Sequence, residues 1–363
     1  MLPSYLNVAF IHELYPENSN WITAHEEGRK YMKAVLGDQV ITQAFFGVGS
    51  GEEAEEAMET AVKNGAEVIF ATTAPLITAC RKTATRHPDV KILNCSISMP
   101  YTGVRTYYSR IYEGKFISGA IAGAISKSNR IGYIASYPIF GVPAGINAFA
   151  LGAQLTNPRA RVELKWSCVP GDPLAELKAQ GIDTVSTLDI PLPGWEQGTW
   201  GTFQILPDGS TELLASPYWD WGAFYVKLAQ SILSGNWDAL NNGKQGSQAV
   251  NYWWGMASGV IGLKMTKALP AGVEVLAQIL KRDMENGLIA PFHRRIVSQD
   301  QVERNSGHTY FTPGELLRMD WLCDNVDGGI PAYEELAEKS QKIVRLQGIY
   351  RDTIPPEKEG VLL

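Results

Sequence analysis

Residues 112–155 read YEGKFISGAIAGAISKSNRIGYIASYPIFGVPAGINAFALGAQL, and this stretch decides the fold of the chain. It predicts an apolar helix over residues 113–126, a short buried strand over 130–136 and a second helix from about Val142. The first helix is almost without bulk between Gly119 and Ala124, so another element can approach its backbone closely. We interpret the stretch as the seam where one α/β lobe passes the chain to another.

The first hundred residues alternate between expected strands and helices with short connections. This alternation favours a parallel, doubly wound sheet. Ligands on such sheets lie beyond the carboxyl ends of the strands, which here are residues 12–20, 72–75 and 94–99. The expected strands cover residues 7–12, 40–46, 67–72 and 90–95, and the expected helices cover residues 21–36, 52–64 and 76–86.

The alternation resumes after the seam but becomes less regular. Residues 191–201, PLPGWEQGTWG, are rich in Pro, Gly and Trp and predict a loop or lid. Residues 312–327 open with Thr-Pro-Gly-Glu, a helix cap followed by a first-turn proline. Further strands are expected over residues 162–167, 183–188, 211–217 and 248–254, and further helices over 144–155, 175–180, 222–233, 273–286 and within 331–351.

Composition limits the class of protein. The chain has 363 residues, 45% hydrophobic and 19% charged, which is typical of a soluble globular protein large enough for two lobes. A net charge of −6 argues against a nucleic-acid or anionic-membrane surface. No apolar stretch is long enough to span a bilayer. We therefore expect neither nucleic-acid binding nor direct membrane insertion.

The sequence offers no clear catalytic or metal-binding motif. The run GVGSG at residues 47–51 lacks the third glycine of a dinucleotide fingerprint, because that position is Glu52 and more carboxylates follow it. There is no G-x-S-x-G elbow, and the five histidines are dispersed. No metal-ligand cluster or cofactor motif stands out. His12 ends the first strand and could face a cleft, although a structural histidine is the simpler interpretation.

The informative signal is aromatic. Ring faces hold a flat heteroaromatic ligand well, and amides or carboxylates along its edge provide specificity. Trp21 follows the first strand in the run NSNW, with Asn20 beside it as a candidate edge reader. For any single tryptophan an ordinary core position is the alternative. Tryptophans that stand out are Trp21, Trp166, Trp195, Trp200, Trp219, Trp221, Trp253 and Trp254.

Two runs carry a family resemblance. Residues 112–136, YEGKFISGAIAGAISKSNRIGYIAS, and residues 145–166, GINAFALGAQLTNPRARVELKW, resemble the basic membrane protein family of solute-binding proteins. The resemblance extends from about Val8 to Pro331 and is weak between Pro173 and Pro217. It implies a type I periplasmic-binding fold, in which two lobes, each a doubly wound parallel sheet, are joined by hinge crossovers. It also implies a receptor for purine bases or nucleosides.

The resemblance also implies a set of ligand-binding residues. The run with Asn20 and Trp21 occupies the place of the family's nucleobase-contacting segment, and Cys168 stands where relatives often carry a bulky aromatic residue. Asp189 could accept a ribose hydroxyl or a base N–H, and capping of the following turn is equally compatible with its position. The other positions carried over are Thr72, Thr73, Tyr112, Asn147, Trp253 and Trp254.

Together these observations predict a non-catalytic module that closes on a purine such as adenine, guanine or hypoxanthine, or on its nucleoside. We expect residues 1–110 and about 220–290 to form one lobe and residues 111–219 and about 291–330 the other, with an extension over 331–363. Hinges are expected near Tyr112, Trp219 and Trp253. The alternative, an enzyme of purine salvage, would need a catalytic base in the cleft.

The sequence leaves two alternatives each for the partner and for the cellular location. The closed form would be read either by an ABC permease or by a fused effector domain, with the module as a ligand sensor. The start MLPSYLNVAFIH has no secretory leader, and Cys80, Cys95, Cys168 and Cys323 are scattered like reduced core thiols. Both features favour a cytoplasmic location. The alternative is an extracytoplasmic, membrane-anchored lipoprotein with its signal removed.

Overall fold

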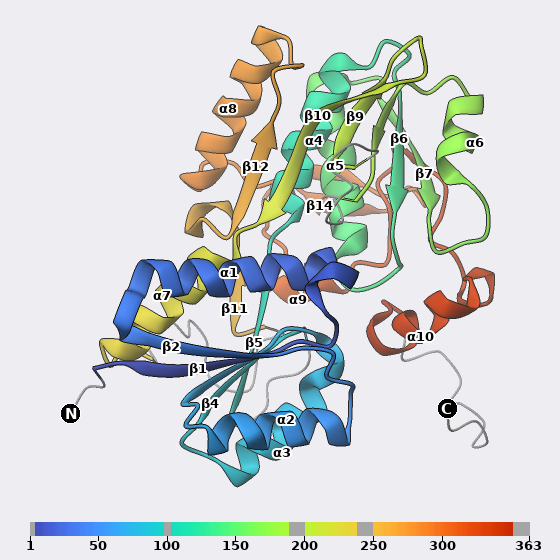
Figure 1. Cartoon of the computed structure of the whole chain (residues 1–363). Coiled ribbons are helices and arrows are strands. Elements are labelled where there is room, and N and C mark those ends of the chain that lie inside the picture. Colours follow the sequence, from blue (N-terminus) through green and yellow to red (C-terminus); the bar gives the residue numbers. More distant parts are fainter. Residues whose placement is uncertain (1–3, 98–102, 189–199, 238–249, 351–363) are drawn as a thin grey trace.

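The chain forms two α/β lobes, each built around its own sheet (Figure 1). The computed structural model describes residues 4–97, 103–188, 200–237 and 250–350. The first lobe is the lower one in Figure 1, and the second lobe stands above it. This is the two-lobed architecture that the sequence predicted.

The first sheet is parallel at every described strand pair, in the order β11-β5-β4-β3-β1-β2. Helices α1 and α7 cover one face and α2 and α3 cover the other (Figure 1). The strands are β1 (Leu6–Ile11), β2 (Val40–Phe45), β3 (Val68–Ala71), β4 (Lys91–Cys95), β5 (Val104–Ser109) and β11 (Tyr252–Trp254), and the helices are α1 (Asn20–Leu36), α2 (Glu52–Lys63), α3 (Ile77–Arg86) and α7 (Trp221–Leu233).

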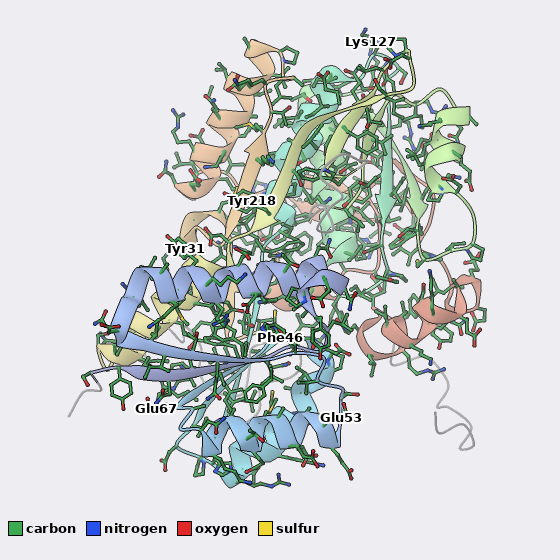
Figure 2. The ribbon with its side chains drawn as sticks, viewed as in Figure 1. Tyr31, Phe46, Glu53, Glu67, Lys127 and Tyr218 are labelled. Atoms are coloured by element: carbon green, nitrogen blue, oxygen red, sulfur yellow. The ribbon has the colours of Figure 1, made fainter. Side chains whose placement is uncertain are left out.

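Both faces of the first sheet are buried, which explains why its strands are nearly continuous apolar runs. In β1, Phe10 packs under α1 and α7, whereas Ala9 and Ile11 pack against α2 and α3. Tyr31 of α1, labelled in Figure 2, lies on α7 at Gly222, where a Cβ atom would meet its ring at 2.5 Å. A larger residue than glycine at position 222 would push the two helices apart.

The second sheet is mixed, in the order β12-β10-β9-β8-β6-β7-β15. Strands β15, β7, β6 and β8 are parallel, but β8–β9, β9–β10 and β10–β12 are antiparallel. The expectation of a parallel second sheet is therefore wrong for the part of the sheet formed by β9, β10 and β12. The strands are β6 (Arg130–Ala135), β7 (Arg161–Trp166), β8 (Thr184–Ser186), β9 (Thr202–Ile205), β10 (Thr211–Trp219), β12 (Ile261–Met265) and β15 (Val326–Asp327).

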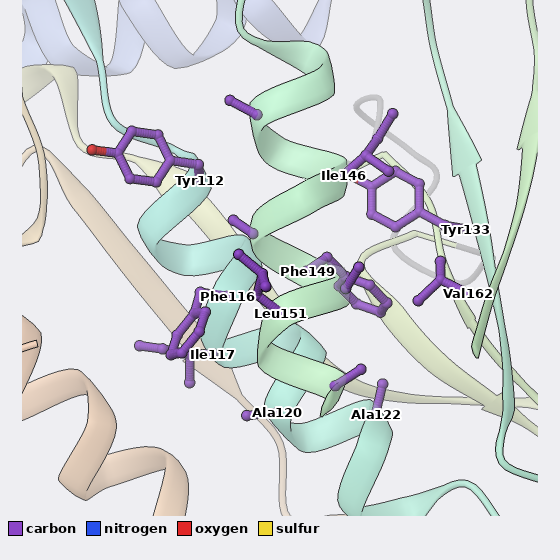
Figure 3. Packing of buried hydrophobic residues seen from close by; sticks show 14 of the residues in the cluster. Tyr112, Phe116, Ile117, Ala120, Ala122, Tyr133, Ile146, Phe149, Leu151 and Val162 are labelled. Atoms are coloured by element: carbon purple, nitrogen blue, oxygen red, sulfur yellow. The ribbon is translucent and has the colours of Figure 1, made fainter. Parts of the chain in front are cut away.

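Two small-residue helices form the centre of the second lobe, α4 (Tyr112–Ile125) and α5 (Val142–Thr156). A Cβ atom on Gly119 would overlap the carbonyl oxygen of Phe149, and one on Gly152 would overlap that of Phe116. The two backbones are therefore in direct contact, as the sequence of the seam predicted. Figure 3 shows Phe149 pointing from α5 toward the ring of Tyr133, and the two rings meet edge to face at 5.0 Å.

The chain passes between the sheets three times: from β5 into α4, from β10 into α7, and from β11 into β12. These crossings fall where hinges were predicted; their bending remains a prediction. Strand β12 and helix α8 (Ala271–Glu285) belong with the second sheet and α4, although residues up to about 290 were expected in the first lobe. We therefore propose a boundary near residue 255.

The end of the described chain packs on the second lobe (Figure 1). Leu336 and Val344 are buried in its core, and α10 occupies part of the helix expected within 331–351. The remaining elements are α6 (Pro173–Ala179), β13 (Arg295–Val297), β14 (Glu303–Ser306), α9 (Pro313–Leu317) and α10 (Glu338–Gln347).

Two general expectations can be compared with the structure. All four cysteines are buried free thiols, as predicted. Among the described residues, no helix combines the length and apolar character needed to cross a bilayer. The predicted lid over 191–201 and the first part of the expected strand over 248–254 lie largely outside the described residues.

Candidate ligand-binding cavity

A cavity of about 250 Å³ lies between the lobes, where the crossovers pass. The first lobe contributes the start of α1 and the end of β5. The second lobe contributes the end of β6, the start of α5 and residues after β8. Its walls are mainly apolar and aromatic, as is common for small-molecule sites. The residues on which the following argument depends are Asn20, Trp21, Tyr108, Ser109, Tyr112, Lys115, Tyr133, Ser136, Ile139, Gly141, Thr187, Trp219 and Trp253.

Trp21 is held rigidly in the first-lobe wall. It lies in the first turn of α1, which Ser19 caps by accepting a hydrogen bond from the amide of Ile22. Its indole Nε1–H donates to the carbonyl oxygen of Thr72 at 2.9 Å. Its ring meets those of Trp219 and Trp221 edge to face, at 5.2 and 5.6 Å. Because the N–H is already used, the indole offers a ligand its carbon surface.

The support behind Trp21 is a buried polar pair. Thr72 donates its hydroxyl to the carbonyl oxygen of Ile11 at 3.1 Å and pairs with His12 Nδ1 at 3.0 Å. Burial lowers the pKa of His12 to about 4, opposed by the carboxylate of Glu26, so the imidazole is neutral near pH 7. Thr72 therefore positions Trp21 through its carbonyl group and does not line the cavity itself.

The crossovers supply a second group of rings. Tyr108 stacks on Trp253 at 6.1 Å with an interplanar angle of 12°, and Tyr112 lies 6.2 Å from the same indole. Trp219 donates its Nε1–H to Ser109 Oγ at 2.7 Å. Burial raises the pKa of both tyrosines, so their hydroxyl groups stay neutral and can donate hydrogen bonds.

The second-lobe wall carries a buried lysine and the N-terminus of a helix. Gly141 adopts a left-handed conformation, φ +83°, and its N–H donates to the carbonyl oxygen of Leu317 at 2.9 Å. The helix α5 begins at the next residue, so its N-terminus, with partial positive charge, meets the cavity. Lys115, only 5% exposed, donates Nζ–H to the carbonyl oxygen of Thr187 at 3.1 Å and lies 5.1 Å from the centre of the Tyr133 ring.

The structure brings four of the predicted ligand residues to this cavity: Asn20, Trp21, Tyr112 and Trp253. Lys115, Tyr133 and Tyr108 line the cavity without having been predicted. The sequence did contain a signal for Lys115, because this cation directly precedes the uncharged run FISGAIAGAI in a largely apolar helix. Tyr133 had none, because buried strands often carry a tyrosine.

The other predicted residues lie elsewhere. Asn147 is buried in α5, where its Oδ1 accepts the amide of Cys323 at 2.8 Å and its Nδ2 donates to the carbonyl oxygen of Trp321 at 2.9 Å. It ties α5 to the chain beyond α9. Trp254 packs edge to face on Phe224 of α7, at 5.1 Å.

Two further predicted residues, Cys168 and Thr73, also lie away from the cavity lining. Cys168 is 2% exposed, and burial raises the pKa of its thiol to about 11, so it is an unreactive core group. Thr73 has a buried hydroxyl with no hydrogen-bond partner among the described residues and does not line the cavity. Asp189 lies outside the described residues. No cluster of three or more His, Cys, Asp or Glu side chains in the described ranges could hold a metal ion.

Comparison with known proteins agrees with this geometry. Residues 6–174 match the Bmp family, described as ABC transporter substrate-binding proteins, PnrA-like. A purine-binding protein of Brucella abortus is 29% identical over 343 residues, which cover 90% of this chain and 94% of the relative. A Haloferax volcanii protein named as an ABC transporter glucose-binding protein is 27% identical, over 70% of this chain and 66% of its own length.

Solved structures support the same fold. A solute-binding protein of Conexibacter woesei matches with a TM-score of 0.57 at 14% identity, covering 78% of this chain and 98% of its own. A transcriptional activator of the comK gene from Bacillus halodurans matches with a TM-score of 0.62 at 17% identity, again over 78% and 98%. The chain thus has the two-lobed fold of ABC-type solute-binding proteins, a class that binds solutes without transforming them. Such proteins typically work outside the cytoplasm, the alternative left open above.

Proposed function

We propose that this protein binds a purine base between its lobes. The main support for this proposal is the set of aromatic rings around the cavity: Trp21 from one lobe, Tyr133 from the other, and Trp253 at a crossover. A flat heterocycle gains most from such walls, because stacking contributes through its whole face. The purine-binding relative from Brucella abortus supports this choice of heterocycle.

The polar groups suit the edge of a purine. Ring nitrogens and exocyclic oxygens accept hydrogen bonds and carry partial negative charge, and the second-lobe wall presents the ammonium group of Lys115 and the positive end of the α5 dipole. Asn20 at the first-lobe wall carries an amide that can both donate and accept. The first lobe would thus supply most of the stacking surface, and the second lobe would add Tyr133 and the charged edge contact of Lys115.

The size of the cavity favours a free base over a nucleoside. Pockets for drug-sized ligands are about 300–1,000 Å³, and this cavity, at about 250 Å³, is smaller. A ribose would need additional space at the mouth. We therefore expect adenine, guanine or hypoxanthine to bind more tightly than adenosine.

Closure would be the output of binding. A ligand that contacts both lobes stabilises the closed arrangement over the open one, and so shifts the equilibrium between them. Bending is assigned to the crossovers near Tyr112, Trp219 and Trp253. The reader of the closed form would be an ABC permease or, in a longer chain, an effector domain.

A thermal-shift screen followed by calorimetry tests the proposal. Adenine, guanine and hypoxanthine are compared with adenosine, ribose and glucose, the last because of the Haloferax volcanii relative. A ligand at 100 times its Kd stabilises the folded state by about 2.7 kcal/mol, so a purine base should raise Tm clearly. A larger shift with glucose than with every purine would refute the proposal.

Trp21→Ala is the matching variant. Stacking of a base on an aromatic ring contributes about 1–3 kcal/mol, so its loss should weaken purine binding about 5- to 150-fold. Trp237→Ala is the matched control, because Trp237 lies in the first lobe, packs on Arg105 and does not line the cavity. Equal affinities of the two variants would remove Trp21 from the site.

A further inference from the structure

The loop that joins β6 to α5, residues 136–141, forms part of the cavity wall. Ser136, Ile139 and Gly141 of this cavity loop all line the cavity. The loop belongs to no strand or helix of the second lobe, so its shape depends on what holds its backbone. Gly141 is tied to α9 by the bond to the carbonyl oxygen of Leu317, and the carbonyl oxygen of Ile139 accepts the N–H of Val142, the first residue of α5.

The middle of the cavity loop, residues 138–140, pairs with the end of the described chain. Ile139 forms an antiparallel bridge with Gly348. The N–H of Phe140 donates to the carbonyl oxygen of Gln347 at 3.1 Å, and the N–H of Ile349 donates to that of Pro138, also at 3.1 Å. Residues more than 200 positions later in the sequence thus form a short strand-like pairing with the back of the cavity wall.

The segment that makes this pairing, residues 337–350, is itself anchored. At its start the N–H of Ala337 donates to the carbonyl oxygen of Cys168, just beyond β7, at 2.8 Å. In its middle Val344 is fully buried in the second-lobe core. At its end the hydroxyl of Tyr350 donates to the carbonyl oxygen of Pro331 at 3.1 Å. These three anchors give the segment a fixed position from which to hold the loop.

We propose that residues 337–350 are a brace that positions the cavity loop and thereby sets the affinity of the site for its ligand. The physical reason is preorganisation: a loop already held in its binding conformation loses less conformational freedom when a ligand arrives. The residues of the brace do not touch the cavity and act through Pro138, Ile139 and Phe140. The proposal rests on the cavity being the ligand site, as proposed above, but not on which purine binds there.

Gly348→Val is the sharpest test. A Cβ atom at this position would overlap the carbonyl oxygen of Val344, so the side chain must push the end of α10 and its pairing with Ile139 apart. Gly272→Val is the matched control, because a Cβ atom on Gly272, in the first turn of α8, meets no atom within 4 Å. Ile349→Pro is a milder second variant. It removes the N–H that is donated to Pro138 and replaces the Ile349 side chain.

Two readouts are needed. The Kd of the purine that gives the largest thermal shift is measured by calorimetry, and hydrogen exchange of the Phe140 amide is measured without ligand. We expect Gly348→Val to raise Kd at least tenfold and to speed exchange at Phe140, while exchange in β6 and β7 is unchanged. Gly272→Val should change neither. If Gly348→Val does not fold, Ile349→Pro should raise Kd severalfold with the same local change in exchange.

The outcomes separate the two proposals. If no purine binds the unaltered protein, the proposed function fails, and exchange at Phe140 alone then decides whether the brace holds the loop. A folded variant with a Kd within twofold of the unaltered protein overturns the brace. So does faster exchange spread evenly through the second lobe, because that pattern belongs to a segment that only adds stability.

Discussion

The helix pairs of the two lobes both pack at glycines but differ in how closely their backbones approach. A Cβ atom on Gly28 of α1 would lie 2.9 Å from the backbone nitrogen of Gly222, a looser contact than those at Gly119 and Gly152. In the first lobe, α1 and α7 are held by large rings, with His25 stacked on Trp221 at 4.5 Å and paired with the hydroxyl of Tyr225 at 2.5 Å. In the second lobe, α4 and α5 meet backbone to backbone at Gly119 and Gly152. Interlocked rings give the first lobe a wall of side chains, whereas close backbones give the second lobe a wall of helix ends and loops. The cavity takes most of its stacking surface from the first lobe and the charged contact of Lys115 from the second.

The strongest test of this comparison is Gly152→Ala in α5. Its new methyl group would overlap the carbonyl oxygen of Phe116, and no rotamer can relieve a Cβ clash. Overpacking typically costs about 1–3 kcal/mol and more against rigid backbone, so we expect the free energy of unfolding to fall by about 3 kcal/mol or more. Urea unfolding measures it.

Gly145→Ala in the same helix is the control. A Cβ atom there is 3.9 Å from its nearest neighbours, an ordinary contact. The gain in helix propensity is about 1 kcal/mol, so this variant should be neutral or slightly more stable. Equal destabilisation of the two variants would contradict the backbone contact between α4 and α5.

Acid should affect the first lobe more than the second. His12 and His25 are fully buried there, and burial lowers the pKa of both imidazoles. A histidine with a lowered folded pKa binds its proton more weakly in the folded than in the unfolded chain. Above pH 6.5 both states are neutral, so the free energy of unfolding keeps its full value. Stability is lost as the pH falls from 6.5 toward the folded value, which is about 4 for His12.

At pH 5 this linkage should cost about 2 kcal/mol for His12, at 1.36 kcal/mol for each pH unit below 6.5. The measurement is the free energy of unfolding at pH 7 and pH 5. His12→Gln, which keeps a polar group beside Thr72 and cannot be charged, should reduce the loss. An unchanged slope in this variant would show that the acid sensitivity comes from other groups, such as His25, whose pKa burial also lowers.

The smallest expected effect concerns the donors of the second lobe. Lys115→Met keeps the length of the side chain and removes its charge and its N–H donors. A hydrogen bond to a charged group contributes about 1.5 kcal/mol or more, so purine affinity should fall about tenfold or more. Calorimetry with hypoxanthine is the measurement.

Lys264→Met is the control for Lys115→Met, since Lys264 carries the same charge on the second sheet outside the cavity. If the two lysine variants bind hypoxanthine equally well, edge recognition belongs to other groups. The proposed contribution of Lys115 from the second lobe would then fail.

The local elements were readable from the sequence because their patterns are local. The expected strand over 7–12 and helix over 21–36 differ by one residue from β1 (Leu6–Ile11) and α1 (Asn20–Leu36). The pairings of β9, β10 and β12 were missed because antiparallel neighbours in a mixed sheet are chosen by tertiary contacts. The same reason explains why α8 was expected in the wrong lobe, since its amphipathic pattern does not say which surface it covers.

The candidate site divides in the same way. Trp21, Tyr112 and Trp253 could be predicted because an aromatic residue after a strand or at a crossover reaches the space between lobes. Lys115 could not be assigned, because its surroundings depend on Thr187, 72 positions away. Asn147 looked like a ligand group, yet its amide is used by the backbone of residues 321–323, a partner that no sequence motif announces.

The backbone contact between α4 and α5 also makes these two helices a single rigid unit, so a rotation at one end of α4 would move the other end. Helix α4 starts at Tyr112, beside the ligand cavity, and its 14 residues extend into the lobe. At a rise of 1.5 Å per residue it is about 21 Å long, so a swing of about 10° at Tyr112 would carry its far tip roughly 4 Å. Locked to α5, the helix cannot slip within the lobe. If the crossovers bend as proposed, a small displacement of the Tyr112 ring would become a larger movement at the far end of the lobe.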